Sequence, residues 1–400
     1  MRTLFTQRAF LAFFLSRENV WFAEAIATTA IGWQIYAIRH QALDLAFVGL
    51  IGFIPQLVLA VPAGLIADRL DRRGVIIVTG IGNLVSSLLF VMLALNHSHS
   101  LAAYFGVLAL YSVADALGVP AQRAMLPSIV SGEQYVRASA LISSISEFGA
   151  IAGPALAGLL IAIAAWVAFA AVAVLQTVGI AASFFLDARM REVPEESLWA
   201  SAVDGFRFII DRKVILGAIS LDLFAVLFGG ATSLLPIYAT AVLHVGATGY
   251  GLLRAAPAVG AGAVGAWLVR RPIARHGARW LFWCVAGFGI ATIVFGFSRN
   301  MALSLLALAG VGGFDMVSVV IRTAIAQLST PEAMRGRISA FENVFIGASN
   351  QLGAFESGTV AQWLGAVPSV VLGGCATIVI VALWTRIFPA LRRFDRLEET

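Results

Sequence analysis

Acidic side chains lie well inside long apolar segments of this 400-residue sequence, where a charge costs free energy unless it meets a partner or a cavity. Burial penalises the charged form of a carboxyl group. A carboxyl group that alternates between the protein interior and an aqueous cavity can therefore bind a proton in one setting and release it in the other. We expect proton-carrying or cavity-lining roles, with the first two as leading candidates, for Glu24, Asp115, Glu147, Asp222 and Asp315.

The alternative interpretation is that intramembrane charges form structural ion pairs that join helices. We favour it for Glu18, which follows Arg17 directly, and for Glu342, which is close to Arg337. Other polar side chains in the apolar segments add charge or hydrogen-bonding capacity. As candidates for a substrate cavity they are Arg17, Asn19, Gln34, Arg254, Asn343, Asn350 and Glu356.

The segments that carry these residues are long enough to cross a bilayer, which takes about 20 apolar residues in a helix. The chain is 60% apolar and 12% charged, too few polar residues for the surface of a soluble protein. We predict twelve spans, near 11–37, 46–67, 75–95, 101–127, 138–163, 166–186, 214–242, 248–269, 280–297, 301–326, 338–364 and 367–386.

Nearly all of the 27 Lys and Arg residues fall in alternate gaps between these spans, and only Arg39 and Arg299 fall in the other gaps. Basic residues stay on the cytoplasmic side during insertion. Both termini and the central loop are therefore expected in the cytoplasm, in a multi-pass protein of the plasma (inner) membrane. The net charge of +5 then reflects topology, and the scattered basic residues do not favour nucleic-acid binding.

The longest polar interruption divides the spans six and six. We predict two six-helix bundles, 1–188 and 214–400, joined by a cytoplasmic loop, 189–213, that carries an amphipathic helix around Trp199, Phe206 and Ile210. A shift of 200 positions places Asp115 on Asp315 and Arg137 on Arg337. Repeated halves with a site between them are typical of transporters.

Apart from Arg386 at the very end of the last one, charged residues are absent from every third span, namely 75–95, 166–186, 280–297 and 367–386. This pattern predicts that these four spans form a lipid-facing scaffold while the other eight enclose a polar cavity.

The stretch Gly64-Leu-Ile-Ala-Asp68-Arg69-Leu-Asp71-Arg72-Arg73 lies between the second and third spans. It resembles the signature loop of the major facilitator superfamily, which often has Gly at the position of Asp71. Asp68 could meet the partly positive N-terminus of the eleventh span, near 336–338, when the cytoplasmic side is closed. The proposed conformational latch comprises Gly64, Asp68, Arg69, Arg72, Arg73, Arg137 and Arg337.

In the fifth span, small residues recur at Gly149, Gly153, Pro154 and Gly158, which resembles a motif of exporters and antiporters and permits close helix approach. The stretches 205–214 and 330–340 resemble the enterobactin-exporter branch of the superfamily. This resemblance implies a proton-coupled exporter of a small organic molecule such as a siderophore. The arginine motif typical of the fourth span in drug–proton antiporters is missing, since Asp115 and Pro120 occupy that span.

We therefore predict an all-α membrane protein with the major facilitator fold, in which two pseudo-symmetric six-helix bundles alternate access to a small-molecule substrate. Multidrug or lipid efflux, uptake, a receptor or assembly subunit that has lost transport, and an intramembrane enzyme are the alternatives. No GxxxxGKS loop, HExxH motif or Cys–His group occurs, so we expect no enzymatic activity, cofactor or metal. The proton gradient would supply the energy to what we expect to be a monomer in the bilayer.

Overall fold

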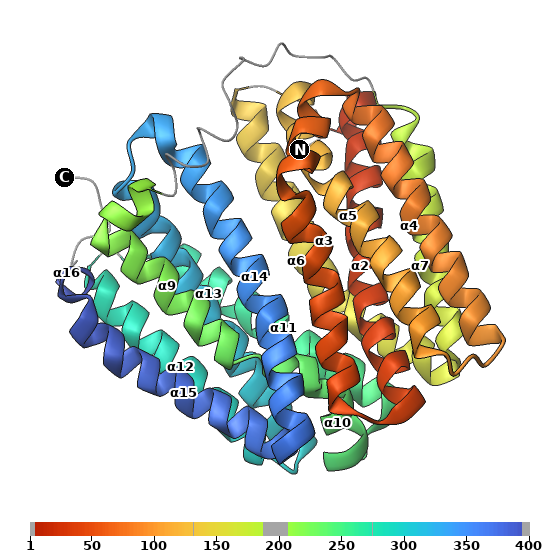
Figure 1. Cartoon of the computed structure of the whole chain (residues 1–400). Helices are drawn as coiled ribbons and strands as arrows, with labels where there is room; N and C mark the ends of the chain where they lie inside the picture. Colours follow the sequence, from red (N-terminus) through yellow and green to blue (C-terminus); the bar gives the residue numbers. More distant parts are fainter. Residues whose placement is uncertain (1–4, 131, 187–206, 274, 394–400) are drawn as a thin grey trace. The chain divides into compact units, whose positions relative to one another are not determined.

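The computed structural model describes residues 5–130, 132–186, 207–273 and 275–393. In this part of the chain all regular elements are helices, and each of the twelve predicted spans coincides with a helical segment (Figure 1). The first half contains α2 (Arg8–Arg39), α3 (Ala42–Arg69), α4 (Arg72–Leu95), α5 (Leu101–Ile129), α6 (Glu133–Ile163) and α7 (Ala165–Ser183). The second half contains α9 (Lys213–Phe228), the short helices η1 (Ala231–Leu234), α10 (Leu235–Ile237) and η2 (Tyr238–Val242), then α11 (Gly246–Arg270), α12 (Gly277–Phe297), α13 (Met301–Leu328), α14 (Glu332–Leu364), α15 (Ala366–Ile387) and α16 (Pro389–Arg392).

Ten of the described helical segments are long and apolar enough to cross a membrane by composition alone. The remaining two long helices, α2 and α14, carry more charge: α2 contains Arg17, Glu18 and Glu24, and α14 contains Glu342 and Glu356. The fold class predicted from the sequence, an all-α membrane protein, is confirmed. The predicted amphipathic helix in 189–213 lies mostly outside the described residues, of which 207–211 are helical.

The seventh predicted span, 214–242, is helical but interrupted. The helix α9 ends at Phe228, and Gly229 and Gly230 precede a series of short helical turns. Close helix packing explains the glycines, because a Cβ on Gly230 would lie 3.0 Å from the carbonyl oxygen of Gly353 on α14. The break therefore lies where α14 approaches this segment.

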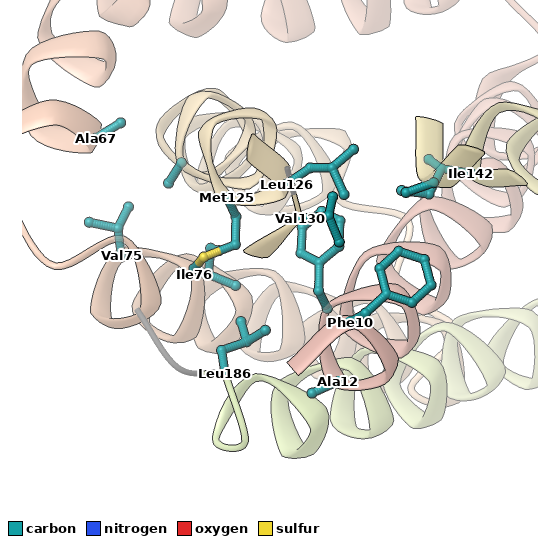
Figure 2. Packing of buried hydrophobic residues seen from close by; sticks show 13 residues of the cluster. Phe10, Ala12, Ala67, Val75, Ile76, Met125, Leu126, Val130, Ile142 and Leu186 are labelled. Atoms are coloured by element: carbon teal, nitrogen blue, oxygen red, sulfur yellow. The ribbon is translucent and has the colours of Figure 1, made fainter. Parts of the chain in front are cut away.

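The residues group into two compact units. Unit 1 contains α2, α3 from Ile51 onward, α4 to α7, and Gly246–Ala255 of α11. Its helix α2 packs on α6 and α7, and α4 packs on α5 and α7. Figure 2 shows its core near one end of these helices, where Phe10, Met125 and Leu126 meet.

Unit 2 contains Gln41–Leu50, α9 with the turns that follow it, and the chain from Ala256 onward. Its helix α9 packs on α14 and α15, and α12 packs on α13 and α15. Its core includes the fully buried Leu221, Leu281 and Ile321. The helices α9, α12, α13, α14 and α15 correspond in the repeat to α2, α4, α5, α6 and α7, and they make the same pairwise contacts. The internal repeat seen in the sequence is therefore also a repeat of helix packing.

Candidate functional site

A small polar cavity in unit 1 lies beside Asp115. Residues of α2, α4, α5 and α7 line it, and its volume of about 10 Å³ is comparable with the space that one water molecule needs. Glycines permit the helices around it to approach closely. A Cβ on Gly118 would lie 2.7 Å from the hydroxyl oxygen of Thr79, and one on Gly179 would lie 3.1 Å from the carbonyl oxygen of Ser16. The polar lining residues are Ser16, Thr79, Asn83, Asp115, Gln122 and Ser183.

Glu24 on α2 interacts electrostatically with Asp115 on α5, and both carboxyl groups are half-buried. The structure thus brings together the two leading candidates for proton coupling. No contact between the helices that carry them was predicted from the sequence. Tyr111, buried one turn before Asp115, also interacts with both acids. Arg123 is the basic residue that acts on Asp115, and its side chain is exposed. Two carboxyl groups that interact in this way repel each other when both are charged.

The helices α4 and α7 were predicted to be charge-free scaffold, and their contribution to this site was missed. Asn83 on α4 and Gln176 on α7 are both buried, and Ser87 donates a hydrogen bond of 2.8 Å to the side-chain oxygen of Gln176. Other faces of α4 and α7 expose apolar residues such as Val78 and Val174. The two helices are therefore apolar outside and polar inside. A search for amides in apolar spans, in addition to charges, finds Asn83 and Gln176.

The ion pair predicted for Glu18 is confirmed. Its carboxylate lies 2.5 Å from the guanidinium of Arg17, which also donates a hydrogen bond of 3.1 Å to the hydroxyl oxygen of Ser146 on α6. The indole nitrogen of Trp21 donates to the carbonyl oxygen of Ser146 at 3.2 Å. This cluster fastens α2 to α6.

In unit 2, Arg322 on α13 forms an ion pair with Asp222 on α9, and both side chains are buried. By sequence Arg322 was grouped with the basic residues that flank the gap between the tenth and eleventh spans, and the structure places it within α13, which continues to Leu328. Asp222 has no basic residue close to it in the sequence, and in the structure its partner is Arg322. Arg322 also interacts with Glu342. The pair expected between Glu342 and Arg337 stays a prediction, because the side chain of Arg337 lies outside the described set.

Asp315 lines a second small cavity, of about 10 Å³, together with Asp222 and Ser318. Residues of α9, α12 and α13 form it. Asp115 and Asp315 occupy equivalent positions in the repeat. The helices α9, α12 and α13 around Asp315 correspond to α2, α4 and α5, which are three of the four helices that line the cavity beside Asp115. The sequence symmetry therefore extends to the surroundings of these two acids.

The other predicted site residues are more dispersed. Glu147 is exposed on α6, Asn350 is exposed on α14, and Arg254 is half-buried on α11. Gln34 donates a hydrogen bond to the hydroxyl oxygen of Tyr104 at 3.1 Å, and Asn19 donates one to the carbonyl oxygen of Leu15 at 2.8 Å. Glu356 accepts a hydrogen bond from Ser357 at 3.3 Å. The side chain of Asn343 lies outside the described set.

The turn between α3 and α4 is held by Asp71, whose carboxylate accepts hydrogen bonds from the backbone nitrogens of Arg73 and Gly74 at 3.2 and 3.1 Å. Asp71 is thus the N-cap of α4, which explains an acid where the family pattern often has Gly. Arg72 donates to the carbonyl oxygen of Ala124 at 2.9 Å. Arg73 donates to that of Phe184, the C-cap of α7, at 2.6 Å.

The remaining residues of the predicted latch differ in their exposure to solvent. Asp68 is half-buried, Arg69 and Arg137 are exposed, and the side chain of Arg337 lies outside the described set. A Cβ on Gly64 would meet nothing within 4 Å. The latch remains a prediction.

The small residues of α6 lie at close helix contacts. A Cβ on Gly153 would lie 2.6 Å from the Cβ of Ala25 on α2, and one on Gly149 would lie 3.5 Å from Trp21. A Cβ on Gly158 would lie 2.8 Å from the Cα of Gly251. Pro154 lies within the same helix. The glycines therefore permit the approach of helix backbones, as small residues do in membranes.

The described residues include no group of three or more His, Cys, Asp or Glu side chains placed to hold a metal ion. The chemistry of the site is that of carboxyl groups, amides and hydroxyls.

Known proteins resemble the chain over nearly its whole length. It is 29% identical to an enterobactin exporter of Citrobacter koseri over 97% of this chain and 94% of that protein. It is 28% identical to an enterobactin exporter of Shigella boydii over the same shares of the two chains.

Among solved structures, the nucleoside transporter NupG has a TM-score of 0.73 at 13% identity, over 94% of this chain and 98% of that one. A POT family transporter in complex with 5-aminolevulinic acid has a TM-score of 0.71 at 12% identity, over 95% and 96%. These two likenesses concern the fold, which is that of the major facilitator superfamily.

The profile of the transmembrane secretion effector family of the major facilitator superfamily matches residues 4–399. The all-helical fold of the described residues, the repeat of helix packing and this match agree, and the chain belongs to that family of multi-pass membrane transporters.

Proposed function

We propose that this transporter exports a small organic molecule, with a siderophore as the leading substrate class, and that protons moving in the opposite direction drive it. The observation that carries the proposal is the carboxyl pair of Glu24 and Asp115, half-buried and close enough to interact. The relatives that are named enterobactin exporters favour export and suggest enterobactin as the first substrate to test.

The physical basis is the unfavourable energy of two adjacent carboxylates in a poorly solvated place. A proton on either acid removes the repulsion. If the pair meets the periplasm in one conformation and the cytoplasm in the other, it takes up a proton on one side and releases it on the other. After the proton is released, the deprotonated protein carries the substrate out as it changes back to the first conformation. The outward flux of substrate and the inward flux of protons are thereby coupled.

The conformational change is alternating access between the halves 1–188 and 214–400, which the loop 189–213 joins. Both termini and this loop face the cytoplasm in the inner membrane, as the basic residues indicate. Asp68 acts as a latch that closes the cytoplasmic side through the N-terminus of α14. The protein works as a monomer without a bound cofactor.

The experiment uses inside-out membrane vesicles from cells that lack their own siderophore exporters. Labelled enterobactin is added outside, and an acid-inside pH gradient is imposed. We expect accumulation that nigericin abolishes. Glu24→Gln and Asp115→Asn should each reduce it by about tenfold or more, since each removes a carboxyl group that the proposal assigns to proton coupling. Asp211→Asn, at an exposed acid before α9, is the matched control and should transport normally.

Accumulation that ignores the pH gradient would refute proton coupling but keep export. No accumulation of enterobactin, with saturable binding retained, would favour a receptor or assembly subunit. Accumulation of amphipathic drugs or lipids in place of enterobactin would favour multidrug or lipid efflux.

A further inference from the structure

Three hydroxyl groups line the cavity beside Asp115, and each of them donates its proton to a hydrogen bond with another group. The hydroxyl of Thr79 donates to the carbonyl oxygen of Val75 at 2.8 Å, and that of Ser183 donates to the carbonyl oxygen of Gly179 at 2.9 Å. Because Ser183 has only one proton, Ser16 is the donor in the 2.7 Å contact between the two serine hydroxyls. These hydroxyls offer the cavity lone pairs.

Asn83 adds an acceptor without a donor. Asn83 lines the cavity and is only 5% exposed. Its Oδ1 receives no hydrogen bond from the described residues. A buried oxygen in this condition costs free energy unless something in the cavity binds it. The carboxyl group of Asp115 lines the same space and adds negative charge. The amide groups of Asn83 and Gln122 also bring N–H donors to the lining, but its hydroxyl and amide oxygens together with one carboxyl group suit a cation.

The size and charge of the cavity select among cations. Its volume of about 10 Å³ holds one particle of the size of a water molecule. Divalent Ca²⁺ is usually held by several carboxylates, and Mg²⁺ retains several waters. One carboxylate among neutral oxygens balances a single positive charge. We propose that this cavity binds a sodium ion through the side-chain oxygens of Asp115, Thr79 and Asn83.

The surroundings agree with this assignment. Glu24 interacts with Asp115 from α2, so a bound cation would offset the repulsion between the two acids. On α5, Tyr111 and Arg123 are the other ionisable groups that interact with Asp115, and Arg123 is exposed. The lining residues from α4 and α7 include no ionisable group. Sodium and protons should therefore compete for Asp115, with sodium affinity falling in acid.

This inference shares Asp115 with the proposed function, but its test needs no transport. Purified full-length protein in detergent is titrated with ²²Na⁺ at pH 8, at constant ionic strength with choline chloride. We expect saturable binding of one ion per chain that K⁺ displaces poorly. Asp115→Asn should abolish it. Thr79→Val should weaken it by about tenfold, the effect of losing one good ligand, while Thr79→Ser should restore it.

Thr292→Val is the matched control. Thr292 on α12 is fully buried and donates to the carbonyl oxygen one turn back, that of Phe288, at 2.9 Å, as Thr79 does with Val75. It lines neither of the two cavities described above. Its variant should bind sodium as the wild type does.

Absence of saturable ²²Na⁺ binding by the wild type would overturn the proposal and leave water as the occupant. Binding that survives both Asp115→Asn and Thr79→Val would place the ion elsewhere and overturn it equally. Either result would leave proton-driven export untouched, provided that the vesicle transport assay is run in sodium-free buffer. Conversely, sodium binding without export would refute the proposed function alone.

Discussion

The guanidinium of Arg322 on α13 pairs with the carboxylate of Asp222 on α9, and the two side chains are only 4% and 8% exposed. Glu342 on α14 interacts with the same arginine. One buried cation thus links three helices of unit 2. Two acids around one base leave a net negative charge, unless one acid holds a proton.

Removing Arg322 should be the most destabilising single change in this cluster. Arg322→Gln leaves Asp222 and Glu342 without a cation, and breaking a buried pair in this way typically costs about 3–5 kcal/mol. Asp222→Asn should cost less, because Glu342 still faces the arginine. The double variant Asp222→Asn/Arg322→Gln should recover part of the loss. Thermal unfolding in detergent, followed by tryptophan fluorescence, gives the coupling energy of the cycle. Additive losses would show that the pair is energetically independent.

Much of the fold could be predicted from the sequence, because a bilayer forces apolar helices of a defined length and basic loops on one side. The positions of Asp115 and Asp315 on equivalent helices followed from the repeat. The partners of the acids could not be predicted, because the contact between Asp222 and Arg322 depends on how α9 and α13 pack. Arg322 was missed because a basic residue near a span end is most simply assigned to the adjacent loop.

Uncharged polar residues were missed for a different physical reason. Asn83 and Gln176 do not disturb the charge pattern that marks the spans, although burying an amide without a partner also costs free energy. The break after α9 was missed because Gly229 and Gly230 are compatible with a membrane helix. Only the approach of α14 shows why glycines are needed there.

Neutralising Glu24 should separate stability from transport. Its carboxyl group and that of Asp115 repel each other when both are charged. Glu24→Gln should therefore unfold at a temperature at least as high as that of the wild type, while pH-gradient-driven accumulation falls by about tenfold or more. Thermal unfolding and vesicle transport at the same pH provide the comparison. A variant that loses stability together with transport would indicate that Glu24 is structural.

The glycines of α6 predict a contrast with an open glycine. Gly153→Leu forces a large side chain against Ala25, since even a Cβ would lie 2.6 Å from the Ala25 Cβ, and overpacking of this kind costs about 1–3 kcal/mol. Gly106→Leu on α5 is the control, because a Cβ there meets nothing within 4 Å and the position is exposed. The two variants should differ clearly in unfolding temperature. Equal temperatures would mean that α2 and α6 can move apart at little cost.

The cap of α4 should be measurable as well. Asp71→Ala removes the acceptor for two backbone N–H groups and should cost about 1 kcal/mol, whereas Asp71→Gly should cost only about a few tenths. Asp71→Asn retains a side-chain oxygen and should unfold close to the wild type. These variants differ in one side chain at a defined helix end, so the ranking of their unfolding temperatures tests the assignment. Loss of the ranking would show that the arginines alone hold the turn.

Asp68 provides the final and sharpest test of the signature loop, because it lies three residues before Asp71 and has a different predicted role. Asp68→Asn should slow gradient-driven transport by about fivefold or more, the effect of losing a contact of roughly 1 kcal/mol in only one of two conformations. Its unfolding temperature should stay near that of the wild type. Asp71→Asn is the matched control, with the same chemical change and the cap retained. If both variants transport equally well, the carboxylate of Asp68 has no part in closing the cytoplasmic side, and the arginines of the loop act only as topological anchors.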